Sequence, residues 1–266
     1  MINKLVQLIL KKIRRNNIPF SYKIWSGDYR NWYEAKKICT GYEAENILTK
    51  CKSSLLQIKY KTSVYERDSV LFDKKHYNWG VISALLQVAI ENKNTLKVLD
   101  FGGSLGSSYY QNLSFTEKID NVQWYVIEQE NFVKCGRENF EDDRLKFYYT
   151  IEECFQDNKP NVILLSSVLQ YIEKPHELIE KVFSLDIDNI IIDRTAFIEC
   201  EKDIITIQNV PEGIYKASYP AWFFNKENFL AHFKHCSEVI EFNSGITPPR
   251  LVNERMAHWS GFIIKK

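Results

Sequence analysis

The chain has no long apolar run, and this absence first excludes membrane-spanning proteins. None of its 266 residues belongs to a segment with the about 18–20 consecutive apolar residues that a spanning helix needs. Residues 1–19 begin with apolar side chains but lack a small-residue cleavage site, and most of their basic residues follow the apolar ones. We therefore expect no signal peptide and a cytoplasmic location.

Residues 1–19 are amphipathic when they are placed on a helix. One side carries the apolar residues Ile2, Leu5, Val6, Ile9 and Ile13, and the other carries most of the basic residues Lys4, Lys11, Arg14 and Arg15. We favour a helix that packs on its own domain with a solvated basic face. The alternative is peripheral contact with the anionic inner face of a membrane.

The chain also lacks a strong net charge and paired cysteine motifs. Its formal charge is +1, so no global field points to a nucleic-acid partner. None of the six cysteines forms a C-x-x-C pair or has a histidine at metal-ligand spacing. We expect reduced thiols and no bound metal.

The first part of the chain, residues 1–92, is predicted to be mainly helical and to form an N-terminal extension or lid. The spacing of apolar residues predicts helices over Asn31–Cys39, Glu43–Lys61 and Asn78–Asn92.

Residues 93–266 alternate between strand and helix patterns and are predicted to form the main domain. The expected strands are Leu96–Phe101, Val122–Ile127, Arg144–Tyr149, Asn161–Ser166, Asn189–Asp193, Glu238–Phe242 and Ser260–Ile264, and the expected helices include Pro175–Leu185 and Glu227–His235. Alternation predicts a parallel sheet with right-handed crossovers. The last two strands, joined without a helix, predict an antiparallel hairpin. The expected fold is α/β: a doubly wound, Rossmann-like, mostly parallel sheet that ends in an antiparallel hairpin, with a helical N-terminal extension.

A glycine-rich turn follows the first expected strand and precedes a stretch that can open a helix. Its sequence is Asp100-Phe101-Gly102-Gly103-Ser104-Leu105-Gly106, and glycines let a backbone turn tightly and approach a ligand. A carboxylate directly before the first glycine suits a ligand with a positive end, such as the amino group of S-adenosylmethionine, more than a pyrophosphate. Glu128 ends the next strand, where a carboxylate can accept hydrogen bonds from both hydroxyls of a ribose. The turn and Glu128 together predict a nucleoside-cofactor site.

A loop with two serines follows the fourth expected strand. Ser166 and Ser167 can donate hydrogen bonds beneath a bound cofactor, and Tyr171 can form a wall of the substrate site. The alternative is a serine turn in which Tyr171 packs on the following helix.

These runs resemble those of class I S-adenosylmethionine-dependent methyltransferases. The resemblance covers roughly residues 96–266 and rests on the hydrophobic-hydrophobic-Asp-x-Gly-Gly-x-x-Gly run, on Glu128, and on the Ser-x-Leu-x-Tyr-Ile-x-x-Pro run from Ser167. It implies a methyltransferase with S-adenosylmethionine as cofactor. The family's commoner loop is Asp-x-Gly-x-Gly-x-Gly, and Ser104 stands here in place of the middle glycine. If that position needs a positive φ, serine costs roughly 1 kcal/mol or more, unless Gly103 takes up the turn.

More narrowly, the chain resembles a bacterial group of methyltransferases associated with surface-polysaccharide biosynthesis. The runs that carry this likeness are Trp25-Ser26-Gly27-Asp28-Tyr29, Tyr65-Glu66-Arg67-Asp68, Asp193-Arg194-Thr195 and Tyr219-Pro220-Ala221-Trp222-Phe223. It implies O-methylation of a sugar in a surface polysaccharide or its precursor, and so a small-molecule or glycan acceptor. The alternative is a non-catalytic protein that keeps the fold for binding or as a scaffold. A dehydrogenase is a weaker choice, because the acid before the glycines and the terminal hairpin disfavour it.

A sugar hydroxyl must lose its proton as the new bond forms, so a general base is expected beside the acceptor. Asp193, at the end of the fifth expected strand, and His258, just before the last one, are our preferred candidates. His76 precedes a predicted helix, and we interpret it as structural.

Four further residues are candidates for binding. Arg67 is predicted to hold the cofactor's carboxylate from the N-terminal lid, although a solvated or ion-paired arginine explains it equally well. Arg194 is predicted to bind an anionic acceptor or to pair with a carboxylate. Tyr219 and Trp222 can stack on a sugar face, or they belong to the core.

Overall fold

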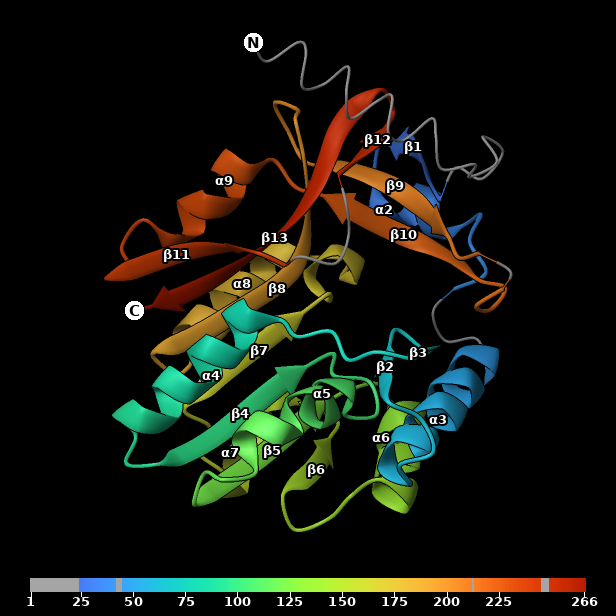
Figure 1. The fold of residues 1–266 in the computed structure, drawn as a ribbon. Coiled ribbons are helices and arrows are strands. Elements are labelled where there is room, and N and C mark those ends of the chain that lie inside the picture. The colour runs from blue at the N-terminus through green and yellow to red at the C-terminus, as the bar shows by residue number, and fades with distance from the viewer. Residues whose placement is uncertain (1–23, 42–44, 212, 245–248) are drawn as a thin grey trace.

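An eight-stranded β-sheet forms the centre of the molecule (Figure 1). Seven of its strands lie side by side, and one short strand pairs with a part of one of them. The computed structural model describes residues 24–41, 45–211, 213–244 and 249–266, so the helix predicted over residues 1–19 lies outside the described residues. Five strands are parallel: β4 (Thr95–Phe101), β5 (Asn121–Ile127), β6 (Leu145–Tyr148), β7 (Val162–Ser166) and β8 (Asn189–Ile198).

The end of the chain adds antiparallel strands to this sheet, as the sequence predicts. Strand β13 (Arg255–Lys265) runs antiparallel to β8, and both β11 (Glu238–Asn243) and β12 (Arg250–Val252) pair antiparallel with β13. The strand order is β11-β13-β8-β7-β4-β5-β6. From β4 the sheet is extended in one direction by β5 and β6. The chain then crosses back and adds β7 on the other side of β4. Ligands bind at such a switch point, beyond the carboxyl ends of the strands.

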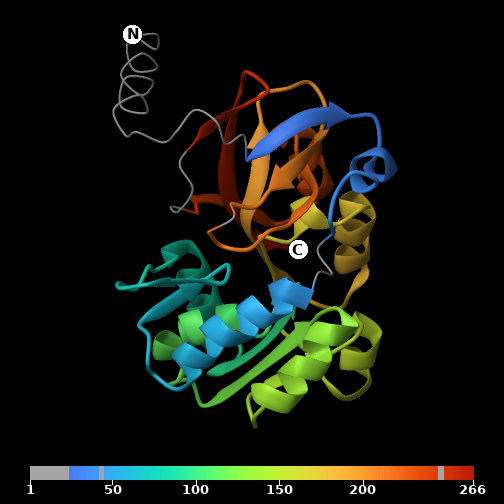
Figure 2. The same ribbon diagram turned by 90° about the vertical axis from the view of Figure 1, so that its right-hand side faces the viewer.

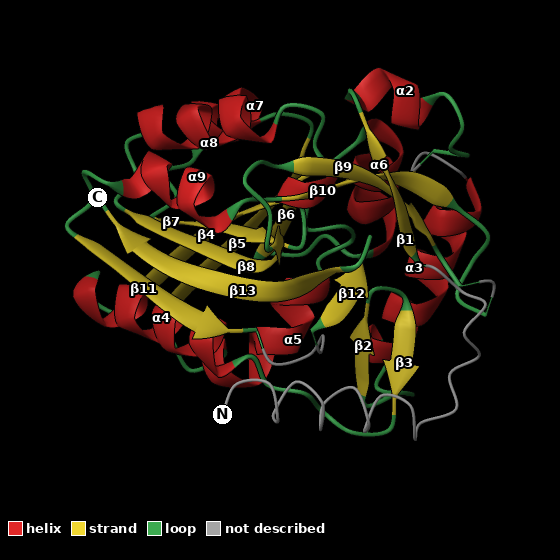
Figure 3. Ribbon diagram, turned by 90° about the horizontal axis from the view of Figure 1, so that it is seen from above, coloured by secondary structure: helices red, strands yellow, loops and turns green. Residues whose placement is uncertain are grey.

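Helices cover both faces of the sheet. Successive residues of a strand point to opposite faces, so strands that are apolar throughout give the sheet two apolar faces to cover. In β7, Val162 and Leu164 join one core cluster and Ile163 and Leu165 join the other. The first cluster packs beneath α3 (Glu45–Lys59), α4 (Trp79–Glu91), α5 (Ser107–Thr116) and α6 (Glu130–Asn139). The second packs beneath α7 (Ile151–Asp157), α8 (Pro175–Ser184) and α9 (Lys226–Leu230), and Figure 3 shows α4 and α5 on the side opposite α7, α8 and α9. The sheet is therefore doubly wound.

A second sheet, which the sequence analysis did not predict, extends from the far end of β8. It contains β1 (Trp25–Tyr29), β9 (Ile204–Asn209) and β10 (Ser218–Phe223), all antiparallel, and helix α2 (Trp32–Lys36) packs against it. Strand β8 is five residues longer than expected, and its Phe197 forms a bridge with Phe224, the residue directly after β10. The predicted helix Glu227–His235 is shorter: α9 is followed by a single 3₁₀ turn at Ala231–Phe233.

The described part of residues 1–92 contains the expected helices and three strands that were not expected. Besides β1, strands β2 (Tyr65–Arg67) and β3 (Val70–Phe72) form a hairpin that is a two-stranded sheet of its own. The hairpin lies near the carboxyl ends of the parallel strands, and Figure 2 shows α3 crossing this side of the molecule. Helix α4 packs on the central sheet, while the division of the chain between residues 92 and 93 stays a prediction. None of the described helices combines the length and apolar character that a membrane crossing requires.

Helix α6 packs unusually close to the sheet, at Gly136. A Cβ built on Gly136 would lie 2.5 Å from a ring carbon of Phe147, and that ring is 1% exposed. Because the ring is enclosed in the core, it cannot move aside without displacing its neighbours.

We predict that Gly136→Ala lowers the free energy of unfolding by about 1–3 kcal/mol, although alanine in an exposed helix would raise it by up to about 1 kcal/mol. Urea unfolding measures the change. Gly213→Ala is the control, because a Cβ there meets nothing within 4 Å. A stabilised Gly136→Ala protein would contradict this account of the packing.

Candidate functional site

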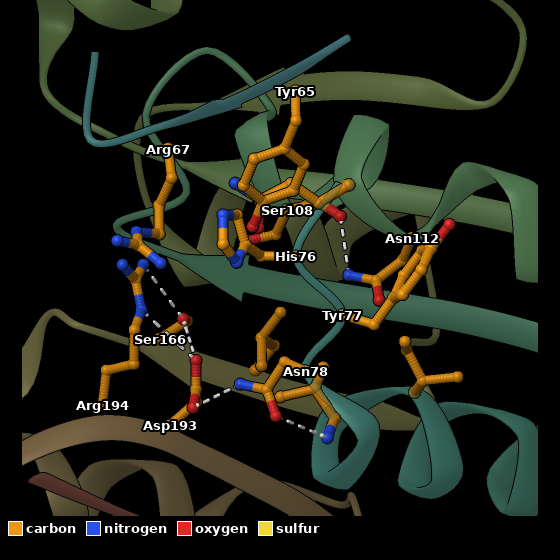
Figure 4. Close-up of a pocket in the computed structure, with 14 residues that line it drawn as sticks. Tyr65, Arg67, His76, Tyr77, Asn78, Ser108, Asn112, Ser166, Asp193 and Arg194 are labelled. Carbon is orange, nitrogen blue, oxygen red and sulfur yellow. Dashed lines mark hydrogen bonds and ion pairs between the residues drawn. The ribbon is translucent and has the colours of Figure 1, made fainter. Parts of the chain in front are cut away.

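A pocket opens beside the carboxyl ends of β7 and β8. Its walls come from the start of α4, the first turns of α5 and the hairpin β2–β3 (Figure 4). Segments far apart in the sequence therefore meet at the switch point of the sheet. The glycine loop joins β4 to α5, whose first turns line this pocket, while the residues of the loop itself are not among its lining residues.

The glycine loop contains three residues in the left-handed region. Gly102 has φ +72° and Gly106 has φ +96°, and Ser104 has φ +56°. The suggestion that Gly103 takes up the turn in place of Ser104 is therefore wrong: Ser104 itself adopts the left-handed conformation, at a cost of roughly 1–2 kcal/mol for a residue with a side chain.

Protein neighbours explain the glycines of this loop. A Cβ on Gly103 would lie 2.6 Å from the carboxyl carbon of Asp100, and one on Gly106 would lie 2.9 Å from a methyl carbon of Leu145. Likewise, a Cβ on Gly102 would lie 2.4 Å from a methyl carbon of Val168. The positive φ of Gly102 and Gly106 agrees with the tight turn that the sequence predicts, and Gly103 lets the loop close over Asp100. The approach of a ligand to these glycines stays a prediction.

The carboxyl group of Asp100 is buried beneath the loop. The Asp100 side chain is 1% exposed, and its Oδ2 accepts a hydrogen bond of 2.8 Å from Nε1 of Trp124 in the adjacent strand β5. Its Oδ1 has no hydrogen-bond partner. Burial raises the pKa of Asp100 to about 7, and the Trp124 hydrogen bond opposes this rise.

Two more carboxyl groups lie close to the loop. Glu128 ends β5 as predicted, and its Oε2 accepts a hydrogen bond of 2.7 Å from the amide of Gln129. Glu66, in β2, accepts one of 2.7 Å from the amide of Ser69 through Oε1, whereas its buried Oε2 has no partner. Burial raises the pKa of each to about 7. Sequence reasoning missed Glu66, because only the fold brings β2 to the loop.

Asp193 and Arg194 both face the pocket because of a β-bulge. These two residues of β8 lie opposite the single residue Gly261 of β13, between the pairs Thr195–Ser260 and Ile192–Phe262. Arg194 has φ +49°. Consecutive strand residues normally point to opposite faces, and a bulge re-aims one of them.

The Asp193 carboxylate is a hub of hydrogen bonds rather than a free base. Its Oδ1 accepts from Nδ2 of Asn78 at 2.7 Å, and its Oδ2 accepts from Oγ of Ser166 at 2.7 Å. Nε of Arg194 lies 3.4 Å from Oδ2. Both oxygens are thus occupied by donors, so the geometry suits Asp193 to orient its neighbours.

The two predicted arginines meet in this pocket, as Figure 4 shows. Nη1 of Arg194 donates to both carboxylate oxygens of Asp68, at 2.9 and 3.1 Å, and Nε of Arg67 lies 3.6 Å from Oδ2 of the same group. Nη1 of Arg67 is buried and has no hydrogen-bond partner. Burial lowers the pKa of Arg67, and the charge of Arg194 adds to this effect.

Histidines are placed differently from our expectation. Of the five in the chain, all within the described residues, His76 is the one that lines the pocket. His258 instead stacks on Phe197 with ring centroids 5.7 Å apart, in the hairpin part of the sheet. Burial lowers the pKa of His258, and so does the charge of Lys226. The structure therefore does not bring His258 together with the other predicted site residues.

The predicted aromatic residues are used in packing. The Tyr171 hydroxyl donates to Oε1 of Gln208 at 2.7 Å, and its ring meets Tyr219 edge to face at 5.3 Å. Trp222 donates to the carbonyl oxygen of Ile172 and stacks on Trp32. Neither Tyr171, Tyr219 nor Trp222 lines this pocket. The packing of Tyr219 and Trp222 is as the core alternative describes, whereas Tyr171, for which the alternative was packing on the following helix, contacts Tyr219 of β10. A role for the three in binding a substrate stays a prediction.

Backbone strain gathers around the site. Five residues with side chains have positive φ here: Asp68, Ser69, Ser104, Ser167 and Arg194. The Ser167 amide donates to the carbonyl oxygen of Asp193 at 2.8 Å, which fixes that turn. Such conformations cost of order 1–3 kcal/mol each and cluster at functional sites. Among the described residues, no three His, Cys, Asp or Glu side chains are placed to hold a metal ion.

Comparison with known proteins finds similarity in solved structures alone: no family model and no curated protein matches the chain. The N-terminal domain of EvdMO1, solved with SAH and D-fucose, is 10% identical over 84% of this chain and 97% of that one, with a TM-score of 0.47. Human N-acetylserotonin methyltransferase with SAM is 12% identical over 85% and 60%, with a TM-score of 0.45. CalS10, an amino pentose methyltransferase from Micromonospora echinaspora, is 10% identical over 72% and 92%, with a TM-score of 0.43. At these values the function rests on the residues of the site itself.

The Asp100–Trp124 hydrogen bond generates a prediction that depends on pH. Trp124→Phe removes the donor and should cost about 1–3 kcal/mol of unfolding free energy when Asp100 is ionised. Because the pKa of Asp100 is about 7, the cost should be larger at pH 8 than at pH 6, where the group is mostly protonated. Denaturant unfolding at both pH values measures it, with the exposed Trp79→Phe as control. An equal cost at the two pH values would refute the role given to Asp100.

Proposed function

We propose that this protein is an S-adenosylmethionine-dependent methyltransferase. The observation that carries the proposal is the group of acidic side chains at the glycine loop: Asp100 and Glu66 each have a buried carboxyl oxygen without a partner, and Glu128 ends the neighbouring strand. Buried carboxyl groups with raised pKa values call for a positive ligand.

The residues present fit the proposed cofactor at both of its charged ends. Asp100 and Glu66 supply negative charge for the ammonium and sulfonium groups, and Arg67 offers an unpartnered buried Nη1 to a carboxylate. Glu128 is placed for ribose hydroxyls, and Ser166 lies at the carboxyl end of β7 beside the pocket. Gly102, Gly103 and Gly106 shape the loop between them, and Ser167 fixes the turn after β7.

The cofactor, when bound, supplies a methyl group that is already electrophilic. The chain's own task is then to position an acceptor atom and to exclude water. Asp193 holds Ser166, Asn78 and Arg194 in place through its two oxygens. Helix α3 and the hairpin β2–β3 lie over the loop, where Cys51 contacts Ser69 at 3.0 Å, and limit access of water.

We further propose His76 as the general base, in place of Asp193 and His258. It lines the pocket and packs against Tyr65, with ring centroids 5.6 Å apart. An imidazole at this position can take the proton that an acceptor hydroxyl loses as the new bond forms.

The acceptor that we propose is a sugar of a surface polysaccharide or its precursor, methylated on oxygen. This part of the proposal rests on the sequence runs that resemble the bacterial group named above, among them Asp193-Arg194-Thr195. A cytoplasmic location follows from the same proposal, since sugar precursors are made there.

We predict that Glu128→Gln and Asp100→Asn each weaken S-adenosylmethionine binding by at least about tenfold, because each removes a hydrogen-bonding charge worth about 1.5–3 kcal/mol. Isothermal titration measures the affinity. Glu138→Gln, at an exposed position of α6, is the control and should bind as the wild type does.

Thermal shift separates the alternatives. S-adenosylmethionine and its demethylated product should both raise the melting temperature of the wild-type protein, and NAD should not. Absence of binding by both would refute the proposed function, whereas protection by NAD alone would favour a dehydrogenase.

His76→Gln tests the proposed base. We expect kcat to fall about 10²–10⁴-fold while the affinity for S-adenosylmethionine stays unchanged, measured as demethylated cofactor formed with a panel of sugars, uronates and sugar phosphates. The exposed His235→Gln is the control. A His76→Gln enzyme with normal kcat, or one that loses cofactor binding equally, would show that His76 is not the base. Binding without turnover on any acceptor by the wild-type protein would favour the non-catalytic alternative.

A further inference from the structure

The guanidinium group of Arg194 is fixed on one edge by two neighbours and paired on the other edge with a surface carboxylate. Its Nε lies 3.4 Å from Oδ2 of Asp193, and its Nη2 lies 3.5 Å from Oγ of Ser166. Nη1 is left to point away from these anchors, and it meets the carboxylate of Asp68. The Arg194 side chain is only 14% exposed, whereas that of Asp68 is 60% exposed. The structure therefore fixes one edge of the Arg194 guanidinium and covers the other edge with an exposed carboxylate.

A second guanidinium strengthens the field at this point. Figure 4 shows the groups of Arg67 and Arg194 facing each other, and the charge of Arg194 lowers the pKa of Arg67. Two buried like charges repel unless an anion lies between them. In this structure Asp68 is that anion, since it contacts both arginines.

The Asp68 side chain is the loosely held part of its hairpin: it is 60% exposed, whereas Tyr65, Glu66 and Ser69 beside it are buried. Asp68 and Ser69 form the turn of the hairpin with φ +51° and +66°, a conformation that glycine or asparagine adopts more readily. Although β2 and β3 pair with each other alone within the described sheets, their hairpin packs on α3 and α5, where Cys51 contacts Ser69 and Gln111 donates to the carbonyl oxygen of Glu66. The Asp68 carboxylate itself faces solvent, and solvent screening weakens its hold on Arg194. An incoming anion can thus displace Asp68.

We propose that Asp68 is an internal stand-in for an oxyanion on the acceptor, so that Arg194 selects acceptors that carry a carboxylate or a phosphate. The inference rests on the proposed function and narrows its substrate class from sugars in general to anionic sugars. When such a group binds Nη1 of Arg194, the exposed side chain of Asp68 is released to solvent while the hairpin stays packed. Neutral sugars leave the contact between Asp68 and Arg194 in place.

The test is isothermal titration of the full-length protein saturated with demethylated cofactor, with D-glucuronate, glucose 1-phosphate and D-glucose as probes. We expect at least one of the two anions to bind at least about tenfold more tightly than glucose. Asp68→Asn should strengthen anion binding about three- to tenfold by freeing Arg194, and asparagine accepts the left-handed conformation of the turn. Asp73→Asn, at an exposed position just after β3, makes the same change of charge and should have no effect.

Arg194→Met should abolish the preference for anions over glucose. Because this buried residue also supports Asp193, its fold is checked by thermal melting, and Asp68→Asn carries the test if the variant fails to fold. Equal binding of glucose and both anions, or an Asp68→Asn protein that behaves like Asp73→Asn, would overturn the inference.

Two outcomes separate this inference from the proposed function. If the demethylated cofactor does not bind but the anion preference and its response to Asp68→Asn persist in its absence, the methyltransferase proposal fails and the oxyanion site stands. If the cofactor and the anions compete, the arginine pair takes the cofactor's own carboxylate, and the assignment to the acceptor is wrong.

Discussion

The buried carboxyl group of Asp100 is the constraint on which the rest of the site depends. It lies beneath the glycine loop, with one oxygen held by Trp124 and the other without a partner. The loop can close over it because Gly103 has no Cβ to meet the carboxyl carbon. The loop leads into α5, whose first turns form one wall of the pocket. The buried acid thus contributes charge to the site and packs against the loop that begins this wall.

The carboxyl groups at the glycine loop are not paired with the guanidinium groups of the site. Glu66, Asp100 and Glu128 gather around the glycine loop, while Arg67 and Arg194 lie toward β8, where their acidic partners are Asp68 and Asp193. Burial raises the pKa of the three carboxyl groups and lowers that of Arg67, so their charged forms are costly in the absence of a ligand. A ligand with a positive and a negative end would neutralise both groups at once, which is the physical reason for preferring a zwitterionic cofactor over a pyrophosphate.

The sequence predicts the parts of this site whose signals are local. Apolar runs mark β4 to β8, and the acid before the glycines and the acid at the end of β5 follow directly from them. The second sheet could not be predicted in the same way, because it pairs Trp25 with Gln208 across most of the chain. The hairpin β2–β3 was missed for a different reason: its turn residues, Asp68 and Ser69, are not the glycine or asparagine that normally mark such a turn.

The same limit explains why Asp193 and His258 were the preferred candidates for the base, while His76, which lines the pocket, was interpreted as structural. A position along a strand says which face a side chain occupies, but not which distant segment covers that face. The β-bulge at Asp193 and Arg194 shows how much depends on such detail. Without the extra residue opposite Gly261, the two side chains would point to opposite faces of the sheet. With it, β8 continues beyond its pairing with β7 toward the second sheet. It also presents the carboxylate of Asp193 and the guanidinium of Arg194 side by side to the pocket. One irregular residue pair therefore joins the two sheets and builds the polar wall of the site, and the strain at Arg194 is retained because both depend on it.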